Sequence, residues 1–376
     1  MGSPDNSLPL GRAVSVSGLG EVLFPNQFEV FTAPLGPAEL HDAREAPKEI
    51  LARLASGAAV ILTGPYSYVD AIYRYCARNE SSLLEPQECV RIADRAQRSA
   101  ALVQARRRKL HHLLVAMRGE ELLNVEGAPE IAGLQEWLEQ PIAGRPFLIP
   151  VRRLQRILTD MRRAREGLRF KFLDAPITIL PHVYVPGDQS VPAMFLEYAP
   201  FFPGRRVLDV GTGTGILALL AARLGAARVV ATDCNPCAVR NARLNVERLG
   251  LKRLVDVREP GDLYEPVAGE VFDVIVFNAP WIQGAPRTLY DTANYDPGFR
   301  VLDGFVRGAP ACLASGGRVL LQYSNLSQRS GASALDHLRE VLADNSLEIT
   351  SRRCISRMSR VLGAQERVFL FEIRQR

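Results

Sequence analysis

The stretch Asp-Val-Gly-Thr-Gly-Thr-Gly at residues 209–215 decides how the C-terminal half of this chain folds. It stands between two apolar segments, 206–210 and 216–222, which indicates a strand followed by a helix. Glycines at such a junction allow a tight turn and let a ligand approach the backbone, and the N–H groups that begin the helix attract an anion. The last glycine comes one residue too early for the dinucleotide pattern G-x-G-x-x-G. The stretch therefore predicts a nucleotide-type cofactor and disfavours NAD.

Apolar strands and helical stretches alternate along this half of the chain. We expect further strands at 228–232, 254–257, 272–277 and 318–323, and helices near 236–249, 298–313 and 331–344. The last two strands, near 346–355 and 366–374, have no helix between them. Buried strands that alternate with helices are typical of a parallel, doubly wound sheet. We predict an α/β fold in which a Rossmann-like seven-stranded sheet ends in an antiparallel hairpin.

Two acidic residues follow neighbouring strands of this predicted sheet. Asp233 ends the second strand, 18 residues after Gly215, where a carboxylate can accept hydrogen bonds from a ribose. The same residue could instead cap the next helix, because Asn235-Pro236 follows it. After the third strand, Asp262-Leu263 could bind an adenine edge and cover its face, and a plain surface turn is an equal alternative.

The fourth strand ends in the tetrapeptide Asn278-Ala279-Pro280-Trp281. Ligands of doubly wound sheets bind at the carboxyl ends of the strands, so this tetrapeptide is placed beside the predicted cofactor. The Asn278 side-chain oxygen and the following backbone carbonyl can accept hydrogen bonds from an NH₂ group. Both acceptors would stabilise positive charge that develops on the nitrogen. Trp281 could stack on a flat substrate.

Together these residues resemble the class I S-adenosylmethionine-dependent methyltransferases over about residues 177–376. The tetrapeptide is similar to the Asn-Pro-Pro-Tyr motif of enzymes that methylate planar nitrogens, which include the HemK-like protein-glutamine methyltransferases. The resemblance implies a catalytic group made of Asn278, Ala279, Pro280 and Trp281. It also implies that S-adenosylmethionine is bound by Asp209, Gly211, Thr212, Gly213, Gly215, Asp233, Cys234, Asp262, Leu263 and Asn278. No metal is expected.

This sequence departs from the motif at two positions. Ala279 replaces a proline, which keeps the backbone carbonyl but reduces rigidity, and Trp281 replaces a tyrosine and enlarges the aromatic face. The segment before the first strand, 181–190, is similar to the corresponding lead-in of HemK-like enzymes. It makes Tyr184 or Gln189 a candidate for the mouth of the cofactor site, with an ordinary loop as the alternative.

The N-terminal half gives a different pattern. Helices are expected near 38–57 and 67–79 around a short strand at 58–62, then across 86–118 and across 150–166. We therefore predict a mainly helical domain over residues 1–175 that recognises the substrate, followed by a catalytic domain over residues 176–376. This N-terminal half is larger than the helical domain of HemK-like proteins, so the resemblance does not carry over their release-factor substrate.

The net charge of +5 is unevenly distributed. Residues 91–118 carry eight basic groups and one acidic group, residues 119–144 carry six acidic groups and no basic one, and residues 145–171 carry nine basic and two acidic groups. The two basic blocks could follow a phosphate backbone. No aromatic residues are interleaved with the run Arg106-Arg107-Arg108-Lys109, which also suits a solvated helix face.

The composition points to a cytoplasmic protein without a membrane span. The longest apolar run, 216–222, is far shorter than the roughly 20 residues that a span requires, and no secretory signal begins the chain. Six Cys are too few for a disulfide scaffold, and the lone pair Cys234 and Cys237 is weak evidence for a metal or redox site. The sequence does not specify an oligomeric state.

The resemblance implies that this chain is an S-adenosylmethionine-dependent N-methyltransferase. Its expected acceptor is a planar nitrogen on a small metabolite or on a protein glutamine. The alternatives are an RNA or DNA base N-methyltransferase, a non-catalytic S-adenosylmethionine-binding regulator in which Ala279 marks lost activity, and, more distantly, a dehydrogenase.

Overall fold

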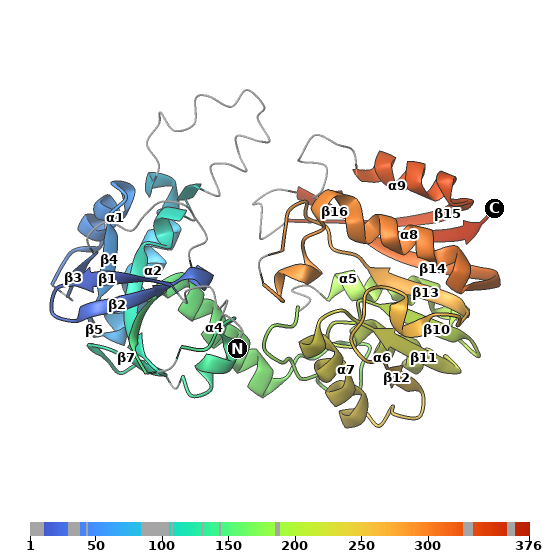
Figure 1. Ribbon diagram of the computed structural model, residues 1–376, viewed down its shortest axis with the longest axis horizontal. Helices are drawn as coiled ribbons and strands as arrows, with labels where there is room; N and C mark the ends of the chain where they lie inside the picture. Colours follow the sequence, from blue (N-terminus) through green and yellow to red (C-terminus); the bar gives the residue numbers. More distant parts are fainter. Residues whose placement is uncertain are drawn as a thin grey trace, which may run out of the picture. The chain divides into compact units, whose positions relative to one another are not determined.

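The computed structural model divides the chain into two compact units, Met1–Arg162 and Arg163–Arg376 (Figure 1). It describes residues 11–28, 38–42, 44–83, 105–106, 108–129, 131–142, 144–184, 189–286, 288–325, 334–358 and 365–376. The division falls inside helix α4 (Val151–Glu166), earlier than the boundary expected at residue 175. Each unit has its own hydrophobic core.

The C-terminal unit contains the predicted doubly wound sheet. Its strand order is β12-β11-β10-β13-β14-β16-β15. The strands are β10 (Arg206–Val210), β11 (Arg228–Thr232), β12 (Val255–Val257), β13 (Phe272–Asn278), β14 (Leu313–Ser324), β15 (Leu347–Met358) and β16 (Gln365–Gln375). The first five pair in parallel, and β16 pairs antiparallel with both β14 and β15. The Rossmann-like sheet and its closing hairpin are therefore confirmed.

The main helices of this unit connect the parallel strands. They are α6 (Ile216–Arg223), α7 (Pro236–Arg248), α8 (Arg300–Cys312) and α9 (Ala334–Asp344). A short helix, α5 (Ser190–Ala193), precedes the first strand of the sheet. Figure 1 shows α8 and α9 on one side of the sheet and α7 on the other. The N-cap of helix α7 is Asn235 and not Asp233, because the Asn235 side chain accepts from the backbone N–H of Cys237 and Pro236 occupies the first turn. The described part of the unit also contains the 3₁₀ turns η5 (Met194–Phe201), η6 (Glu265–Val267), η7 (Asp291–Ala293) and η8 (Pro297–Phe299).

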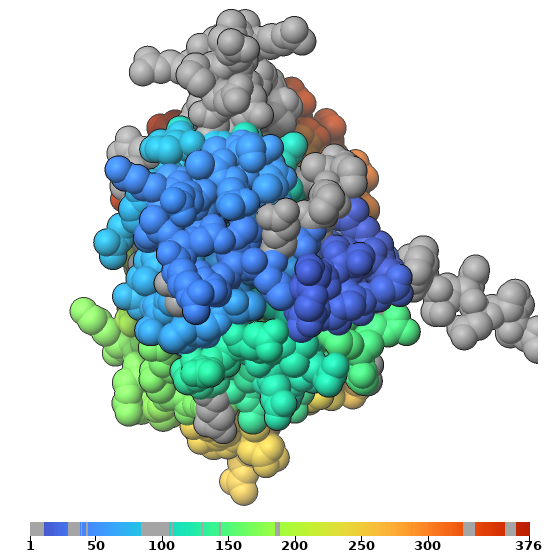
Figure 2. Space-filling view, turned by 90° about the vertical axis from the view of Figure 1, so that its left-hand side faces the viewer, coloured from blue at the N-terminus to red at the C-terminus, as the bar shows by residue number. Residues whose placement is uncertain are grey.

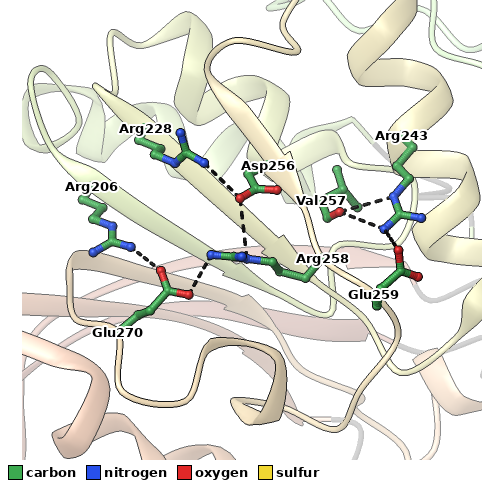
Figure 3. Close-up of polar contacts among 8 residues, drawn as sticks. All are labelled: Arg206, Arg228, Arg243, Asp256, Val257, Arg258, Glu259 and Glu270. Atoms are coloured by element: carbon green, nitrogen blue, oxygen red, sulfur yellow. Dashed lines mark hydrogen bonds and ion pairs between the residues drawn. The ribbon is translucent and has the colours of Figure 1, made fainter.

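Several arginines form an ion-pair network beside the neighbouring strands β10, β11 and β12 (Figure 3). Glu270 binds both Arg206 and Arg258, and Asp256 binds both Arg258 and Arg228. Beside it, Arg243 donates to the carbonyl of Val257 and, at 2.7 Å, to Glu259. Partly exposed pairs of this kind stabilise a fold only modestly. Their main effect here is to balance the basic side chains at this edge with carboxylates.

The N-terminal unit is built on strands, so the prediction of a mainly helical domain is wrong. Its sheet has the order β4-β3-β1-β2-β9-β6-β7, and an additional pairing of β4 with β6 closes it on itself. The strands are β1 (Gly11–Val16), β2 (Gly20–Pro25), β3 (Ala38–His41), β4 (Ala59–Leu62), β6 (Leu113–Arg118), β7 (Glu121–Leu122) and β9 (Pro146–Pro150), with a separate pair β5 (Gly64–Pro65) and β8 (Val125–Glu126). On the face shown in Figure 2, the β1–β2 hairpin (dark blue) lies beside the segment that contains α1 (lighter blue).

Three helices of this unit have described bounds, and residues 105–106 and 108–110, inside the helix predicted at 86–118, are helical as well. The three helices are α1 (Pro47–Ala55), α2 (Tyr66–Arg78) and α4, with short turns η1 (Asn26–Phe28), η2 (Glu80–Leu83) and η4 (Leu134–Trp137). Segment 113–118, predicted to end a long helix, is strand β6. Residues 86–104 of that predicted helix lie outside the described residues. The error arises because a continuously buried strand is a plain apolar run, which periodicity does not distinguish from a buried helix. The amphipathic helix expected at 150–166 is confirmed.

No helix in the described ranges has both the length and the apolar character needed to cross a membrane.

Two buried asparagines on α7 fix the segment that leads into the catalytic sheet. Asn241 accepts from the N–H of Leu180 and donates to the carbonyl of Thr178. Asn245 accepts from the N–H of Thr178 and donates to the carbonyls of Thr178 and Thr214. Both side chains are fully buried, so water cannot reach these backbone groups. The two asparagines supply the hydrogen bonds that the backbone groups would otherwise lack.

We predict that Asn245→Ala lowers the free energy of unfolding by roughly 1–3 kcal/mol, because it leaves buried backbone groups without partners. Urea denaturation measures this loss. Arg248→Ala, on the exposed side of the same helix, is the matched control and should change stability little. A loss no larger than that of the control would show that these hydrogen bonds are replaceable.

Candidate cofactor and acceptor site

A cavity of about 300 Å³ lies at the carboxyl ends of β10, β11, β13 and β14. The glycine turn, Asp233 and Asn278 all line it, which brings together residues that are far apart in the sequence. The register explains this, since Val210 pairs with both Thr232 and Phe277 at the ends of adjacent parallel strands. The volume is at the lower end of the range found for ligand pockets.

The glycine turn has the backbone shape that the sequence predicts. Gly211, Gly213 and Gly215 have φ values of 64°, 56° and 86°, a region in which other residues are strained. A Cβ atom on Gly211 would also lie 2.9 Å from the ring of Phe277. Glycine is therefore strongly favoured at this position, and the turn leaves open backbone along the cavity wall.

Asp209 lies beneath this turn and does not line the cavity. Its buried Oδ2 accepts from the Thr212 hydroxyl at 2.7 Å and from the Ala218 N–H at 3.0 Å. Burial raises the pKa of Asp209 to about 7, although these two hydrogen bonds act in the opposite direction. The residue expected to touch the cofactor thus holds the turn and the start of α6 in place.

Asp233 does line the cavity. One carboxylate oxygen accepts from the N–H of Gly213 at 2.9 Å, and the other accepts from the N–H of Asn235 at 2.9 Å. Burial raises the pKa of Asp233, and these hydrogen bonds counteract the shift. A carboxylate oxygen has two lone pairs, so each can accept a further hydrogen bond from a ligand hydroxyl.

The remaining predicted cofactor residues, Thr212, Cys234, Asp262 and Leu263, also line the cavity. Asp262 accepts from Arg300, a second lining residue, at 3.1 Å. Burial raises the pKa of the Cys234 thiol to about 11, which makes it a poor nucleophile at neutral pH. Among the described residues, no group of three or more His, Cys, Asp or Glu side chains could hold a metal ion.

Asn278 carries the most informative atom of the site. Its Oδ1 is buried and has no hydrogen-bond partner within the described residues. Most buried acceptors in folded proteins are paired, and leaving one unpaired costs about 1–3 kcal/mol. Because Asn278 lines the cavity, this acceptor is a candidate partner for a donor on a ligand.

The rest of the tetrapeptide is placed differently from the prediction. Pro280 lines the cavity, whereas Ala279 is buried and donates its N–H to the carbonyl of Gln322 at 3.2 Å. Trp281 is only 9% exposed, packs in the core and does not line the cavity, so it does not present the expected stacking face. Its backbone N–H is instead held by the carbonyl of Asn294.

The lead-in segment contributes one of its two candidates. Tyr184 lines the cavity, and its ring lies 6.2 Å from that of Tyr290. Gln189 is exposed, donates to the carbonyl of Arg169 at 2.8 Å and does not line the cavity. Sequence reasoning missed Gln322 and Arg357, which also line the cavity. The end of the fifth strand could have indicated Gln322, but Arg357 depends on the fold of the hairpin.

These features fit the predicted cofactor. The glycine turn, Asp233 and Asn278 all line the cavity. The carboxylate of Asp233 could accept from a ribose, and the Oδ1 of Asn278 has no partner among the described residues. The cofactor's adenine would lie near Asp262 and Leu263, and its methionine part beside the turn.

Asp209 makes a pH-dependent contribution to stability that can be measured. Its pKa is about 7 in the folded protein and has an ordinary value near 3.8 in the unfolded chain. Between these values the folded state binds more protons, so the contribution is most favourable below about pH 4 and is lost as the pH rises through about 7. The substitution Asp209→Asn would keep an acceptor for Thr212 and Ala218 and remove this titration.

We predict that the free energy of unfolding of the wild type, minus that of Asp209→Asn, decreases between about pH 5 and about pH 8. Urea denaturation at several pH values gives both terms. Asp336→Asn, on the exposed face of α9, controls for general effects of pH. A difference that is constant or rises with pH would contradict the assignment.

Comparison with known proteins places these features in a family. A model of the ribosomal protein L11 methyltransferases matches residues 196–282. A putative protein N5-glutamine methyltransferase of Methanocaldococcus jannaschii is 31% identical over 172 residues, which cover 43% of this chain and 79% of that protein.

Two shorter matches agree with this result. The L11 methyltransferase of Desulforamulus reducens is 44% identical over 24% of this chain and 30% of its own length. The release factor glutamine methyltransferase of Xylella fastidiosa is 36% identical over 32% of this chain and 46% of its own length. The chain thus spans less than half of these two relatives.

Among solved structures, an L11 methylase from Lactobacillus delbrueckii subsp. bulgaricus has a TM-score of 0.39 and 24% identity, covering 53% of this chain and 85% of that one. The family assignment depends on the sequence matches, and the glycine turn, the acidic residue after β11 and the tetrapeptide after β13 are consistent with it. The chain belongs to the S-adenosylmethionine-dependent methyltransferases, in the group that contains the HemK-like enzymes.

Proposed function

We propose that this enzyme methylates the side-chain nitrogen of a glutamine in a protein. Two observations carry the proposal: Asn278 lines the cavity, and its buried Oδ1 has no hydrogen-bond partner among the described residues. A primary carboxamide offers two N–H donors, and one of them can satisfy this oxygen. Relatives that are named as methyltransferases of protein glutamine support the same acceptor.

The chain's own residues would hold both reactants at the ends of the strands. Asp233 would bind the ribose of S-adenosylmethionine, and the backbone of the glycine turn would border its methionine part. The bound cofactor supplies an activated methyl group on a positively charged sulfur. Holding the acceptor nitrogen in line with that methyl group would provide much of the rate acceleration.

Asn278 would act on the acceptor by electrostatics. A carboxamide nitrogen is a weak nucleophile because its lone pair is delocalised into the carbonyl group. As the nitrogen bonds to the methyl group it gains positive charge, and the Asn278 oxygen stabilises that charge through the N–H it accepts. No residue has to remove a proton first, because the proton can leave after the methyl group has been transferred.

We predict that Asn278→Ala lowers kcat by about 10²–10³-fold, as loss of a single transition-state hydrogen bond does elsewhere. Its affinity for S-adenosylhomocysteine should stay within about twofold of the wild type, because Asp233 and the glycine turn are intact. Turnover is measured with labelled S-adenosylmethionine and cell extract, and mass spectrometry locates the added methyl group. Calorimetry gives the affinity.

Asn345→Ala is the matched control for this substitution. Asn345 follows the end of α9, donates to the carbonyl of Val341 at 2.8 Å and does not line the cavity. Unchanged turnover in Asn278→Ala would show that the acceptor nitrogen is held elsewhere. A methyl group found on a nucleic-acid base or a small metabolite, rather than on glutamine, would contradict the proposed acceptor.

A further inference from the structure

Arg357 lies on the cavity wall although the methylation of a neutral carboxamide does not require a cation. It comes from β15, the first strand of the closing hairpin, and its cross-strand partner in the register is Glu366 of β16. Its guanidinium carbon lies 5.7 Å from the centre of the Trp281 ring. Trp281 follows Asn278 by three residues, so this cation is at the acceptor end of the cavity.

A buried carboxylate fixes the orientation of this side chain. Glu366 is 1% exposed, and one of its oxygens accepts from Nε of Arg357 at 3.1 Å. The other oxygen accepts from the hydroxyl of Ser324, on β14, at 2.9 Å. Three strands thus hold the guanidinium in one place, and it is not a flexible surface group.

The two arginines that line the described part of the cavity have different surroundings. Arg300 pairs with Asp262, at the end where the adenine is expected. Arg357 is at the other end, where the cofactor would place a positively charged sulfur. A second positive charge there opposes binding of that sulfur, and a carboxylate in the cavity would offset it. Such a carboxylate could belong to the methionine part of the cofactor or to the acceptor, and the two sources give different results in the binding test below.

We propose that Arg357 binds a carboxylate of the methyl acceptor, which in a protein is an acidic side chain next to the glutamine. The proposal rests on the proposed function, because it assigns the sequence context of that glutamine. A guanidinium presents its donors in a planar fork that matches a carboxylate. A carboxylate fits better than a phosphate dianion, because Glu366 already balances part of the charge.

The purely structural alternative is that Arg357 serves only to neutralise Glu366. A buried ion pair is weak evidence for stability, since apolar residues of similar volume often replace it without loss. The structural role predicts no dependence of acceptor binding on the charge of the acceptor. The proposed role predicts a strong dependence, so the two can be separated.

The test uses three blocked hexapeptides, each with one glutamine, that differ only in having Glu, Met or Lys before it. Calorimetry measures their binding to the full chain saturated with S-adenosylhomocysteine. The wild type should bind the Glu peptide more tightly than the Met peptide by about tenfold or more, and the Lys peptide most weakly. Arg357→Gln should bind the Glu and Met peptides equally, and Arg357→Lys should keep a reduced preference.

The matched control is Arg353→Gln on the same strand. Arg353 is exposed, pairs with Glu197 at 2.7 Å and does not line the cavity, so its variant should behave as the wild type. Affinity for S-adenosylhomocysteine within about twofold of the wild type shows that each variant is folded and that Arg357 does not hold the carboxylate of the cofactor. Loss of this affinity in Arg357→Gln, with Arg353→Gln unchanged, would assign Arg357 to the cofactor and overturn the proposal. The proposal is overturned if the wild type has no charge preference, if Arg357→Gln retains it, or if none of the peptides binds.

Turnover of the same peptides separates this proposal from the proposed function. Arg357-dependent binding of the Glu peptide without methylation would leave the carboxylate site in place and remove glutamine as the acceptor. Methylation of glutamine without charge preference would support the proposed function and overturn the role of Arg357.

Discussion

The hydrogen bonds that the carboxylate of Asp209 accepts are the constraint on which the catalytic unit depends. Asp209 lies near the end of a buried strand, and from beneath the glycine turn it binds both the Thr212 hydroxyl and the Ala218 N–H. The turn cannot move away from the strand while these bonds hold. The open backbone of the turn, the start of α6 and the position of Asp233, which binds the N–H of Gly213, all follow from this anchor.

Parallel pairing extends this order across the sheet. Because Val210 and Phe277 are register partners, Asn278 comes to the same edge as the turn. The site then contains acceptors that already have hydrogen-bond partners and one acceptor without a partner among the described residues. Asp233 already accepts two backbone hydrogen bonds and is held rigidly, whereas the Oδ1 of Asn278 has no partner among the described residues. A cavity with one unpaired acceptor beside a fixed cofactor site is suited to holding a donor group for methyl transfer.

The sequence was sufficient for the catalytic sheet but not for the N-terminal unit. Glycine turns and strand ends are local signals, so the positions of Gly211, Asp233 and Asn278 could be predicted from the chain alone. The closed sheet of the N-terminal unit depends on pairings such as that of β4 with β6, and its apolar runs carry no period that separates strand from helix. The stacking role predicted for Trp281 was wrong, and Arg357 was not predicted at all. Both residues depend on the hairpin that brings them together, which is a tertiary feature.

An NMR experiment can show whether the cofactor's methyl group is delivered to Asn278. The enzyme is bound to S-adenosylmethionine that carries a ¹³C-labelled methyl group. We expect a nuclear Overhauser effect from that methyl group to the side-chain amide of Asn278, identified by its loss in Asn278→Ala. Effects confined to residues at the Asp262 and Arg300 end of the cavity would show that the methyl group is delivered elsewhere.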